Sequence, residues 1–283
     1  VDGALPVEVG LIRALFARYE DPAQTAFADQ DRAALDAAYA DAMAEVAAAF
    51  PHDPDVGTLL ADARMNQRPW DYWTSNYWER TGDAKPGTQQ ALDTLRGVIA
   101  AHPAHPGAHH LRIHLCEASP HLTEAVASAD ALVGLVPGAG HLVHMPSHAW
   151  IRVGRYLDAE RVNTRAIAVD HDYFAGAGLQ GTYEFYLAHK HHFRAWAAMY
   201  AGRYAVARQS ARQLVADLPE VLQVEAAEFT DGFLPVELHV LVRFGKWDEI
   251  LAVPQFNPRY PFSRAMRAYA RGVAFAATGR VRE

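Results

Sequence analysis

The chain has 283 residues, 51% of them apolar, and 26 Lys and Arg against 33 Asp and Glu give it a net charge of −7. This composition excludes a disordered chain, and the acidic balance argues against a nucleic-acid partner, which would need a basic face. The single cysteine, Cys116, excludes a disulfide framework and a cysteine-based zinc module. No apolar run approaches the roughly 20 residues of a membrane span, and no signal peptide is visible at Val1, so we expect a cytoplasmic protein that does not enter a membrane.

Apolar residues recur along the chain at intervals of three and four, as an amphipathic helix requires. Residues 31–50 are an example, with apolar side chains at Leu35, Tyr39, Met43, Val46 and Phe50. The strict alternation of a half-buried strand is not sustained anywhere. The sequence therefore predicts an all-α protein.

A turn motif of a glycine, any residue and an aromatic recurs in the C-terminal half of the chain. It occurs at Gly154, Gly202 and Gly245, and Gly279 follows Gly245 by 34 residues, which is the tetratricopeptide period. A glycine suits this turn because a tight connection between antiparallel helices needs a residue that tolerates positive φ.

The repeat pattern continues upstream. An alanine and a proline stand eleven or twelve residues apart, as the small residue and the closing proline of a repeat should, at Ala125 and Pro137, Ala91 and Pro103, and Ala40 and Pro51. The sequence therefore predicts tetratricopeptide-like helix-turn-helix repeats stacked into a right-handed superhelix. We expect a single α-solenoid domain over residues 1–283, with about six helix pairs, insertions near 68–86, 173–186 and 218–233, and truncation at both ends.

Thirteen of the fifteen histidines lie between His102 and His192. Two repeats are numbered with their turn glycines, Gly154 and Gly202, at position 15, and the preceding repeat is counted back from Ala125 at position 20. Seven of these histidines and one glutamate then fall at positions 2, 5, 9 and 12, which share one face of a helix. The resemblance to tetratricopeptide repeats implies that this face lines a concave groove, here formed by residues 106–201. The side chains that we expect to converge in this groove are His110, His114, Glu117, His141, His144, His148, His189 and His192.

Metal binding is the chemistry that this pattern favours. Histidines four apart on a helix can chelate one ion, and both His110/His114 and His144/His148 are such pairs. The seven histidines are thus candidate ligands, and Glu117 is a candidate ligand or catalytic base. Imidazole ligation without thiolate suits copper first, iron second and zinc third, with one or two ions. A groove that binds an anion through protonated histidines is the alternative.

The remaining histidines have other expected places. Those beside prolines or near turns are His102, His105 and His121. His109 and His191 point away from the shared face, so we expect them to pack between helices or to orient a ligand. His239 is at position 9 of the next repeat and could reach the groove.

Pro146 lies between His144 and His148 and removes one helix hydrogen bond. The helix is therefore either kinked at Pro146 or begins near Met145. A late start would leave His141 and His144 in a loop.

Four further side chains are candidate substrate-binding residues. Arg152 and Tyr200 share position 13, Trp196 takes position 9 in its repeat, and Tyr183 lies near the end of a glycine-containing insertion, residues 175–186, that is a candidate lid. A second insertion is rich in aromatic residues, which we expect to form a hydrophobic plug at one rim rather than a lid: Trp70, Tyr72, Trp73, Tyr77 and Trp78.

Several motifs resemble those of a large bacterial family of tetratricopeptide-repeat proteins. They are His105-Pro106-Gly107 with His110 and His114, the string GHLVHMPSH at residues 140–148, and His189 with His192-Phe193. The resemblance extends over nearly the whole chain and implies the repeat fold, but it implies no activity. The family commonly has Asn where this chain has Lys190, and we expect that lysine to point away from a bound cation.

The sequence therefore predicts a copper- or iron-dependent oxidoreductase or oxygenase that acts on a small molecule in the groove. A zinc-dependent hydrolase is a variant of this interpretation. The alternative is a scaffold without catalysis whose groove binds a peptide or protein.

Overall fold

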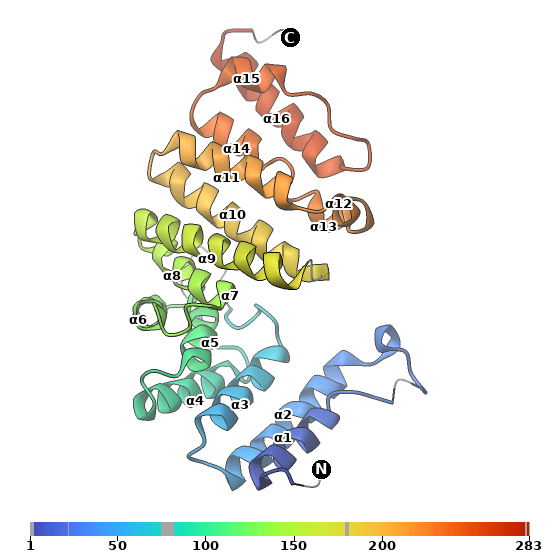
Figure 1. Cartoon of the computed structure of the whole chain (residues 1–283), viewed down its shortest axis with the longest axis vertical. Helices are drawn as coiled ribbons and strands as arrows, with labels where there is room; N and C mark the ends of the chain where they lie inside the picture. The colour runs from blue at the N-terminus through green and yellow to red at the C-terminus, as the bar shows by residue number, and fades with distance from the viewer. Residues whose placement is uncertain (1–2, 22, 75–81, 179–180, 281, 283) are drawn as a thin grey trace. The chain divides into compact units, whose positions relative to one another are not determined.

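The computed structural model describes residues 3–21, 23–74, 82–178, 181–280 and 282 (Figure 1). All regular elements among these residues are helices, apart from an isolated antiparallel bridge between Trp73 and Ala84, so the all-α prediction is confirmed. No described helix is both long and apolar enough to cross a membrane. The chain forms two compact units, Val1–Val136 and Pro137–Glu283. A continuous array over residues 1–283 stays a prediction.

In the N-terminal unit each helix packs against the next one in the chain. The side chains that the sequence places on one face of residues 31–50 do form a core, in which Tyr39, Met43 and Val46 are buried. The elements of this unit are α1 (Pro6–Phe16), η1 (Phe27–Asp29), α2 (Arg32–Ala49), α3 (Pro54–Asn66), α4 (Thr88–Ala101), α5 (Pro106–Cys116) and α6 (Leu122–Leu132).

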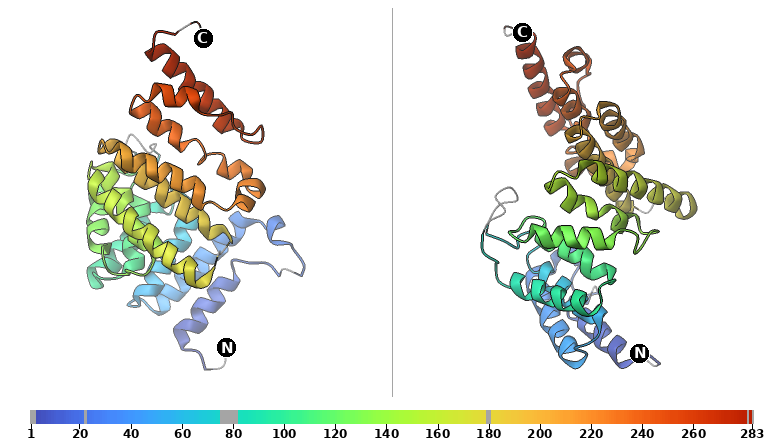
Figure 2. Two further views of the ribbon diagram at one scale, coloured as in Figure 1. Left: turned by 45° about the horizontal axis from the view of Figure 1, so that its top comes forward. Right: turned by 90° about the vertical axis from the view of Figure 1, so that its left-hand side faces the viewer.

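The C-terminal unit is built around α10, which packs against both α9 and α11, while α7 and α8 pack against α9 (Figure 2). Further along, α14 contacts α11 and α16. The elements of this unit are α7 (Gly140–His144), α8 (Pro146–Arg152), α9 (Tyr156–Ala177), η2 (Gly181–Tyr183), α10 (Glu184–Tyr200), α11 (Tyr204–Asp217), α12 (Glu220–Glu225), α13 (Ala227–Thr230), α14 (Val236–Arg243), α15 (Trp247–Ala252) and α16 (Pro261–Ala277).

The predicted turns have the backbone that the glycine motif requires. Gly154 has a φ of 81° and Gly202 a φ of 73°, and the residue after each donates its N–H to a carbonyl five residues back, over 2.9 Å to Trp150 and 2.8 Å to Ala198. This six-residue hydrogen bond ends a helix around a left-handed residue. The same bond follows Gly245 and Gly279. The turn chemistry of the helix pairs is therefore as the sequence predicts.

The predicted insertions contain more regular structure than expected. Helix α9 continues to Ala177, and α10 begins at Glu184 after the short helix η2. Two short helices, α12 and α13, occupy much of the third insertion.

The aromatic insertion divides between core and surface. Tyr72 and Trp73 are buried, as a hydrophobic plug requires, whereas Trp70 is exposed. The Trp73 indole donates to the carbonyl of Leu115 over 2.8 Å. Tyr77 and Trp78 lie outside the described residues.

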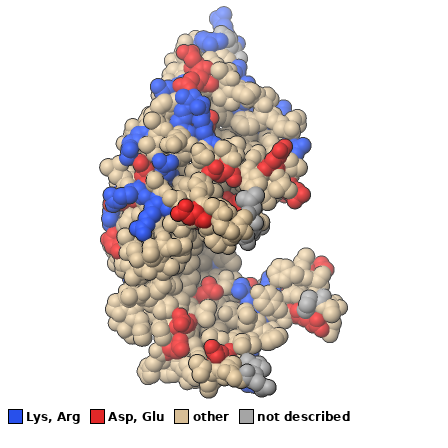
Figure 3. Space-filling model, viewed as in Figure 1, with Lys and Arg blue, Asp and Glu red and all other residues tan. Residues whose placement is uncertain are grey.

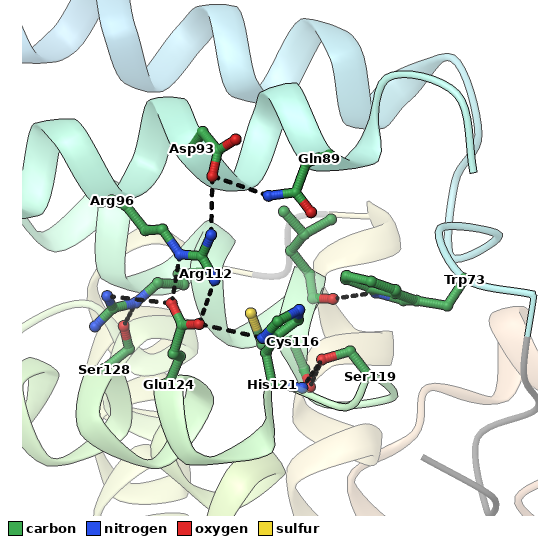
Figure 4. Close-up of polar contacts among 11 residues, drawn as sticks. Trp73, Gln89, Asp93, Arg96, Arg112, Cys116, Ser119, His121, Glu124 and Ser128 are labelled. Atoms are coloured by element: carbon green, nitrogen blue, oxygen red, sulfur yellow. Dashed lines mark hydrogen bonds and ion pairs between the residues drawn. The ribbon is translucent and has the colours of Figure 1, made fainter. Parts of the chain in front are cut away.

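A polar network connects α4, α5 and α6 in the N-terminal unit (Figure 4). Arg96 on α4 donates to both carboxylate oxygens of Glu124 on α6, over 3.0 and 2.6 Å, and to Asp93 over 2.8 Å. Arg112 on α5 donates to Ser128 on α6 over 2.6 Å. The planar guanidinium of Arg96 suits this two-pronged contact, which ties helices that are distant in sequence.

A buried ion pair joins α9 to α10 in the C-terminal unit. The Lys190 ammonium donates to the Asp170 carboxylate, and both side chains are almost fully buried. Tyr183 donates to the other oxygen of Asp170 over 3.3 Å. A Cβ on Gly140, the first residue of α7, would come within 1.9 Å of that same oxygen, so only glycine allows this approach. Asp170 is therefore the point at which α7, α9 and α10 meet.

We expect the Lys190→Met variant to lower the free energy of unfolding by about 3–5 kcal/mol, because the buried Asp170 carboxylate would lose its cation. The double variant Lys190→Met/Asp170→Leu should recover most of that loss, since a matched apolar pair leaves no buried charge. Urea denaturation followed by circular dichroism measures both. If the second substitution lowers the free energy of unfolding further, instead of restoring it, Lys190 and Asp170 are not energetically coupled.

Candidate metal centre

Pro146 interrupts the helical segment that carries three of the candidate ligands, His141, His144 and His148. Helix α7 ends at His144 and α8 begins at Pro146, and Met145 between them keeps helical angles (φ −50°, ψ −37°). The helix is thus broken at the proline without leaving the helical path, and His141 and His144 remain in a helix. A helix does begin next to Met145, as one of the two alternatives has it, but the expected consequence that His141 and His144 lie in a loop is wrong.

Three imidazoles converge in the C-terminal unit. His144 Nε2 lies 2.9 Å from His148 Nε2, which lies 3.4 Å from His189 Nε2. One ring nitrogen from each residue can be chosen so that all three atoms are within 4.8 Å of one another. His144 and His148 come from α7 and α8, and His189 comes from α10. This is the three-histidine donor set of many protein-bound transition metals.

Asn163 on α9 determines how His144 presents its ring. The Asn163 amide nitrogen donates to the carbonyl of Ala159 over 2.8 Å, so its oxygen faces His144 and accepts from Nδ1 over 2.6 Å. The proton of neutral His144 therefore sits on Nδ1, and the lone pair of Nε2 faces His148. Histidines that bind metals are commonly oriented in this way by an acceptor behind the ring.

The surroundings keep these rings ready for a cation. Burial, and then the neighbouring rings of His148 and His189, lower the pKa of His144 well below its usual value. His144 is therefore neutral at neutral pH, which is the form that binds a metal. The ring of Phe193 covers the group, with its centroid 5.0 Å from that of His144, 4.5 Å from His148 and 4.6 Å from His189.

The two other predicted ligands of this unit have different surroundings. The ring of His141 is centred 6.1 Å from that of His144 and meets Tyr186 edge to face at 5.2 Å. His192 lies one helical turn after His189 but faces Phe233 on the connection before α14. It belongs to none of the metal-compatible groups among the described residues.

His192 lines a pocket of about 400 Å³ between α10 and α14. Two predicted substrate-binding residues, Trp196 and Tyr200, are also in its wall, together with Met199, Val236, His239 and Arg243. The guanidinium of Arg243 lies over the ring of Tyr200, 5.5 Å from its centroid. Apolar walls with a few polar groups are typical of small-molecule sites.

The other two candidate substrate-binding residues lie elsewhere. Tyr183 donates to Asp170, and burial followed by that carboxylate raises its pKa to about 12. Arg152 is half-buried at the end of α8. Neither lines the pocket.

The N-terminal unit carries the remaining candidates on α5. The rings of His110 and His114 meet edge to face at 4.9 Å, and Nδ1 of His114 lies 3.2 Å from a carboxylate oxygen of the buried Glu117. Two imidazoles and a carboxylate thus share one helix face, as the register predicts. Convergence of all seven histidines on one space stays a prediction.

Cys116 belongs to none of the metal-compatible groups among the described residues. Burial raises the pKa of its thiol to about 12. Cys116 lies among the polar contacts of Figure 4 as a buried small residue.

The histidines outside the register are placed as the sequence predicts. His102, His105 and His121 are all helix-boundary residues, and His105 caps α5 by accepting from the N–H of Ala108 over 3.1 Å. His109 is buried between α5 and α6, where it contacts Ser128 over 3.1 Å.

The structure adds three features that the sequence analysis missed. Asn163 and Phe193 complete the surroundings of the triad. Asn163 has no distinctive sequence signal, whereas Phe193 stands in the His192-Phe193 motif without a predicted role. His171, His191 and Asp217 form a second group, drawn from three helices. The sequence prediction gives buried His191 either a packing role or the role of orienting a ligand, and it gives Asp217 no role.

The chain matches no protein-family model, and a search of curated proteins finds no significant relative. The side-chain geometry is therefore the basis on which a function is inferred.

We expect acid to destabilise the protein partly through His192. Burial, and then His239, lower its pKa from 6.5 to about 4, so the folded state resists protonation that the unfolded chain accepts. This contribution to stability is present above pH 6.5 and is lost as the pH falls toward 4. Between pH 7 and pH 4, the decrease in the free energy of unfolding should be about 3 kcal/mol smaller in His192→Gln than in the wild type. Urea denaturation at each pH measures this difference. Parallel pH profiles of the two proteins would contradict this assignment.

Proposed function

We propose that this protein is a metal-dependent oxidoreductase or oxygenase that acts on a small molecule. The ion is held by His144, His148 and His189, and copper is the first choice, iron the second and zinc the third. The seven-histidine pool predicted from the sequence is thereby reduced to three ligands within the C-terminal unit.

The observation that carries this proposal is the convergence of three Nε2 atoms with Asn163 behind His144. A hydrogen bond, with one proton between two nitrogens, would account for two neighbouring imidazoles. Here a nitrogen of a third imidazole approaches the same point, which one such hydrogen bond does not explain. His144 and His148 are buried, and burial together with the neighbouring rings keeps His144 in the neutral form that binds a metal ion.

The donor set suits each of the three metals. Three imidazoles without a thiolate can hold copper, iron or zinc, and they disfavour calcium and magnesium, which prefer oxygen ligands. A copper or iron ion held there would supply the redox chemistry of an oxidation or oxygenation. A zinc ion would instead supply hydrolytic chemistry.

The pocket beside α10 supports a small-molecule substrate. It is large enough for a single-ring compound, Trp196 and Tyr200 offer aromatic walls, and Arg243 offers a cation. The C-terminal unit has 17 Lys and Arg against 14 Asp and Glu, whereas the N-terminal unit has 9 against 19. Lys and Arg side chains gather on the C-terminal unit on the face seen in Figure 3. An anionic substrate is therefore favoured.

The wider assignment belongs to this proposal as well. Membership of the bacterial tetratricopeptide-repeat family and a superhelical array are consistent with the all-helical fold and its repeated turns. A cytoplasmic location is proposed together with them. If the groove binds a peptide or protein without catalysis, the same array would act as a scaffold. Metal content discriminates between the two functions.

We expect elemental analysis of the purified protein to find transition metal in an amount that accounts for one ion bound at the triad of each chain. His148→Ala and His189→Ala should each lower metal affinity by more than about 100-fold, because each removes one of three ligands. His239→Gln, a matched change in the same unit outside the triad, should leave affinity unchanged. A visible absorption band would identify copper or iron rather than zinc. Equal metal content in all four proteins would exclude the proposed centre.

We expect Asn163→Leu to weaken metal binding by about 10–100-fold, because Nδ1–H of His144 would lose its acceptor. Asn163→Asp retains an oxygen at the same position and should keep the affinity near that of the wild type. Calorimetric titration of each metal-free protein with copper or zinc gives the comparison. A loss of equal size in both variants would indicate that Asn163 acts only through packing.

A further inference from the structure

A second group of metal-binding side chains lies in the C-terminal unit, formed by His171 on α9, His191 on α10 and Asp217 at the end of α11. Nε2 of His171 is 3.1 Å and Nε2 of His191 is 2.9 Å from the same oxygen, Oδ2 of Asp217. One ligand atom from each residue can be chosen so that all three lie within 4.8 Å of one another. None of the three belongs to the His144, His148 and His189 triad.

These separations are close to those within a zinc site. With zinc bonds of about 2.0–2.1 Å and tetrahedral angles, neighbouring ligand atoms stand about 3.3 Å apart. The two observed nitrogen–oxygen distances fall short of this value by only a few tenths of an ångström. A cation could take the place of the two N–H···O contacts with a small adjustment of the side chains, provided that each ring carries its proton on Nδ1.

The carboxylate is prepared for this role. Gln213 donates to the other oxygen, Oδ1, of Asp217 over 2.9 Å, which orients the group and leaves Oδ2 to the histidines. Burial opposes ionisation of Asp217, but the hydrogen bonds from His191, Gln213 and His171 outweigh it and lower its pKa to about 2. The carboxylate is thus ionised at neutral pH, and no Lys or Arg among the described residues pairs with it.

We infer that His171, His191 and Asp217 form a second divalent-cation site, suited to zinc, that clamps α9, α10 and α11 together. His191 is 1% exposed, whereas the side chain of His171 is 47% exposed, so the ion would have a buried ligand on one side and solvent on the other. Water would complete the coordination. Because Asn163 and Asp170 lie on α9 and His189 lies on α10, this clamp would also stabilise the scaffold of the triad.

The test is calorimetric titration of the metal-free full-length protein with Zn²⁺ alone. The wild type should bind one ion more than His171→Gln and Asp217→Asn do, and that ion should raise the midpoint of thermal unfolding in the wild type only. His171 is exposed, so its replacement by Gln should leave the fold intact.

The matched control is Asp172→Asn, which changes an exposed carboxylate next to His171 outside the cluster and should bind zinc as the wild type does. A His189→Ala background separates the two sites: there, Asp217→Asn should still remove one ion. If His171→Gln and Asp217→Asn bind as many zinc ions as the wild type, with the same affinity, the second site is excluded. That result would leave the triad untouched, and loss of zinc only in His189→Ala would support the triad alone.

Discussion

The buried carboxylate of Asp170 is the constraint on which the candidate metal centre depends. It accepts hydrogen bonds from the ammonium of Lys190 on α10 and from the hydroxyl of Tyr183. It also lies so close to Gly140 that only glycine fits as the first residue of α7. An unpaired charge at this depth would cost several kcal/mol, so the three helices are held to the geometry that satisfies it. Two of these helices supply His144 and His189, and α8, which supplies His148, continues directly from α7.

The third helix, α9, provides the polar face behind the triad. Asn163 and Asp170 are seven residues apart, which is about two helical turns, and both are buried. Asn163 accepts a hydrogen bond from Nδ1 of His144, and Asp170 forms the ion pair with Lys190. A single helix face therefore orients one ligand directly and fixes the helix that carries another. Small and apolar side chains of α9, among them Ala159, Ala166 and Ile167, are buried on the same side of the helix as these two polar residues.

Four consecutive residues of α10 show how closely the chemistry follows helix geometry. His189 joins the triad, Lys190 pairs with Asp170, His191 bonds Asp217, and His192 enters the pocket shared with Trp196 and Tyr200. Successive side chains on a helix are rotated by about 100°, so neighbours in sequence reach different surroundings. The three histidines of this segment therefore lie in three different environments and do not form one site.

The sequence by itself determined the helical class, the glycine turns and the membership of His144, His148 and His189 in one register, because these follow from periodicity and local backbone preference. It also indicated that His109 and His191 would pack between helices, since both fall off the shared face. Only the tertiary structure decided that His192 turns toward His239 and not the triad, that Asn163 and Phe193 surround the three rings, and that His171 meets Asp217. Those outcomes depend on how neighbouring helices approach one another, and side-chain spacing along one helix carries no information about the residues that face it across a contact.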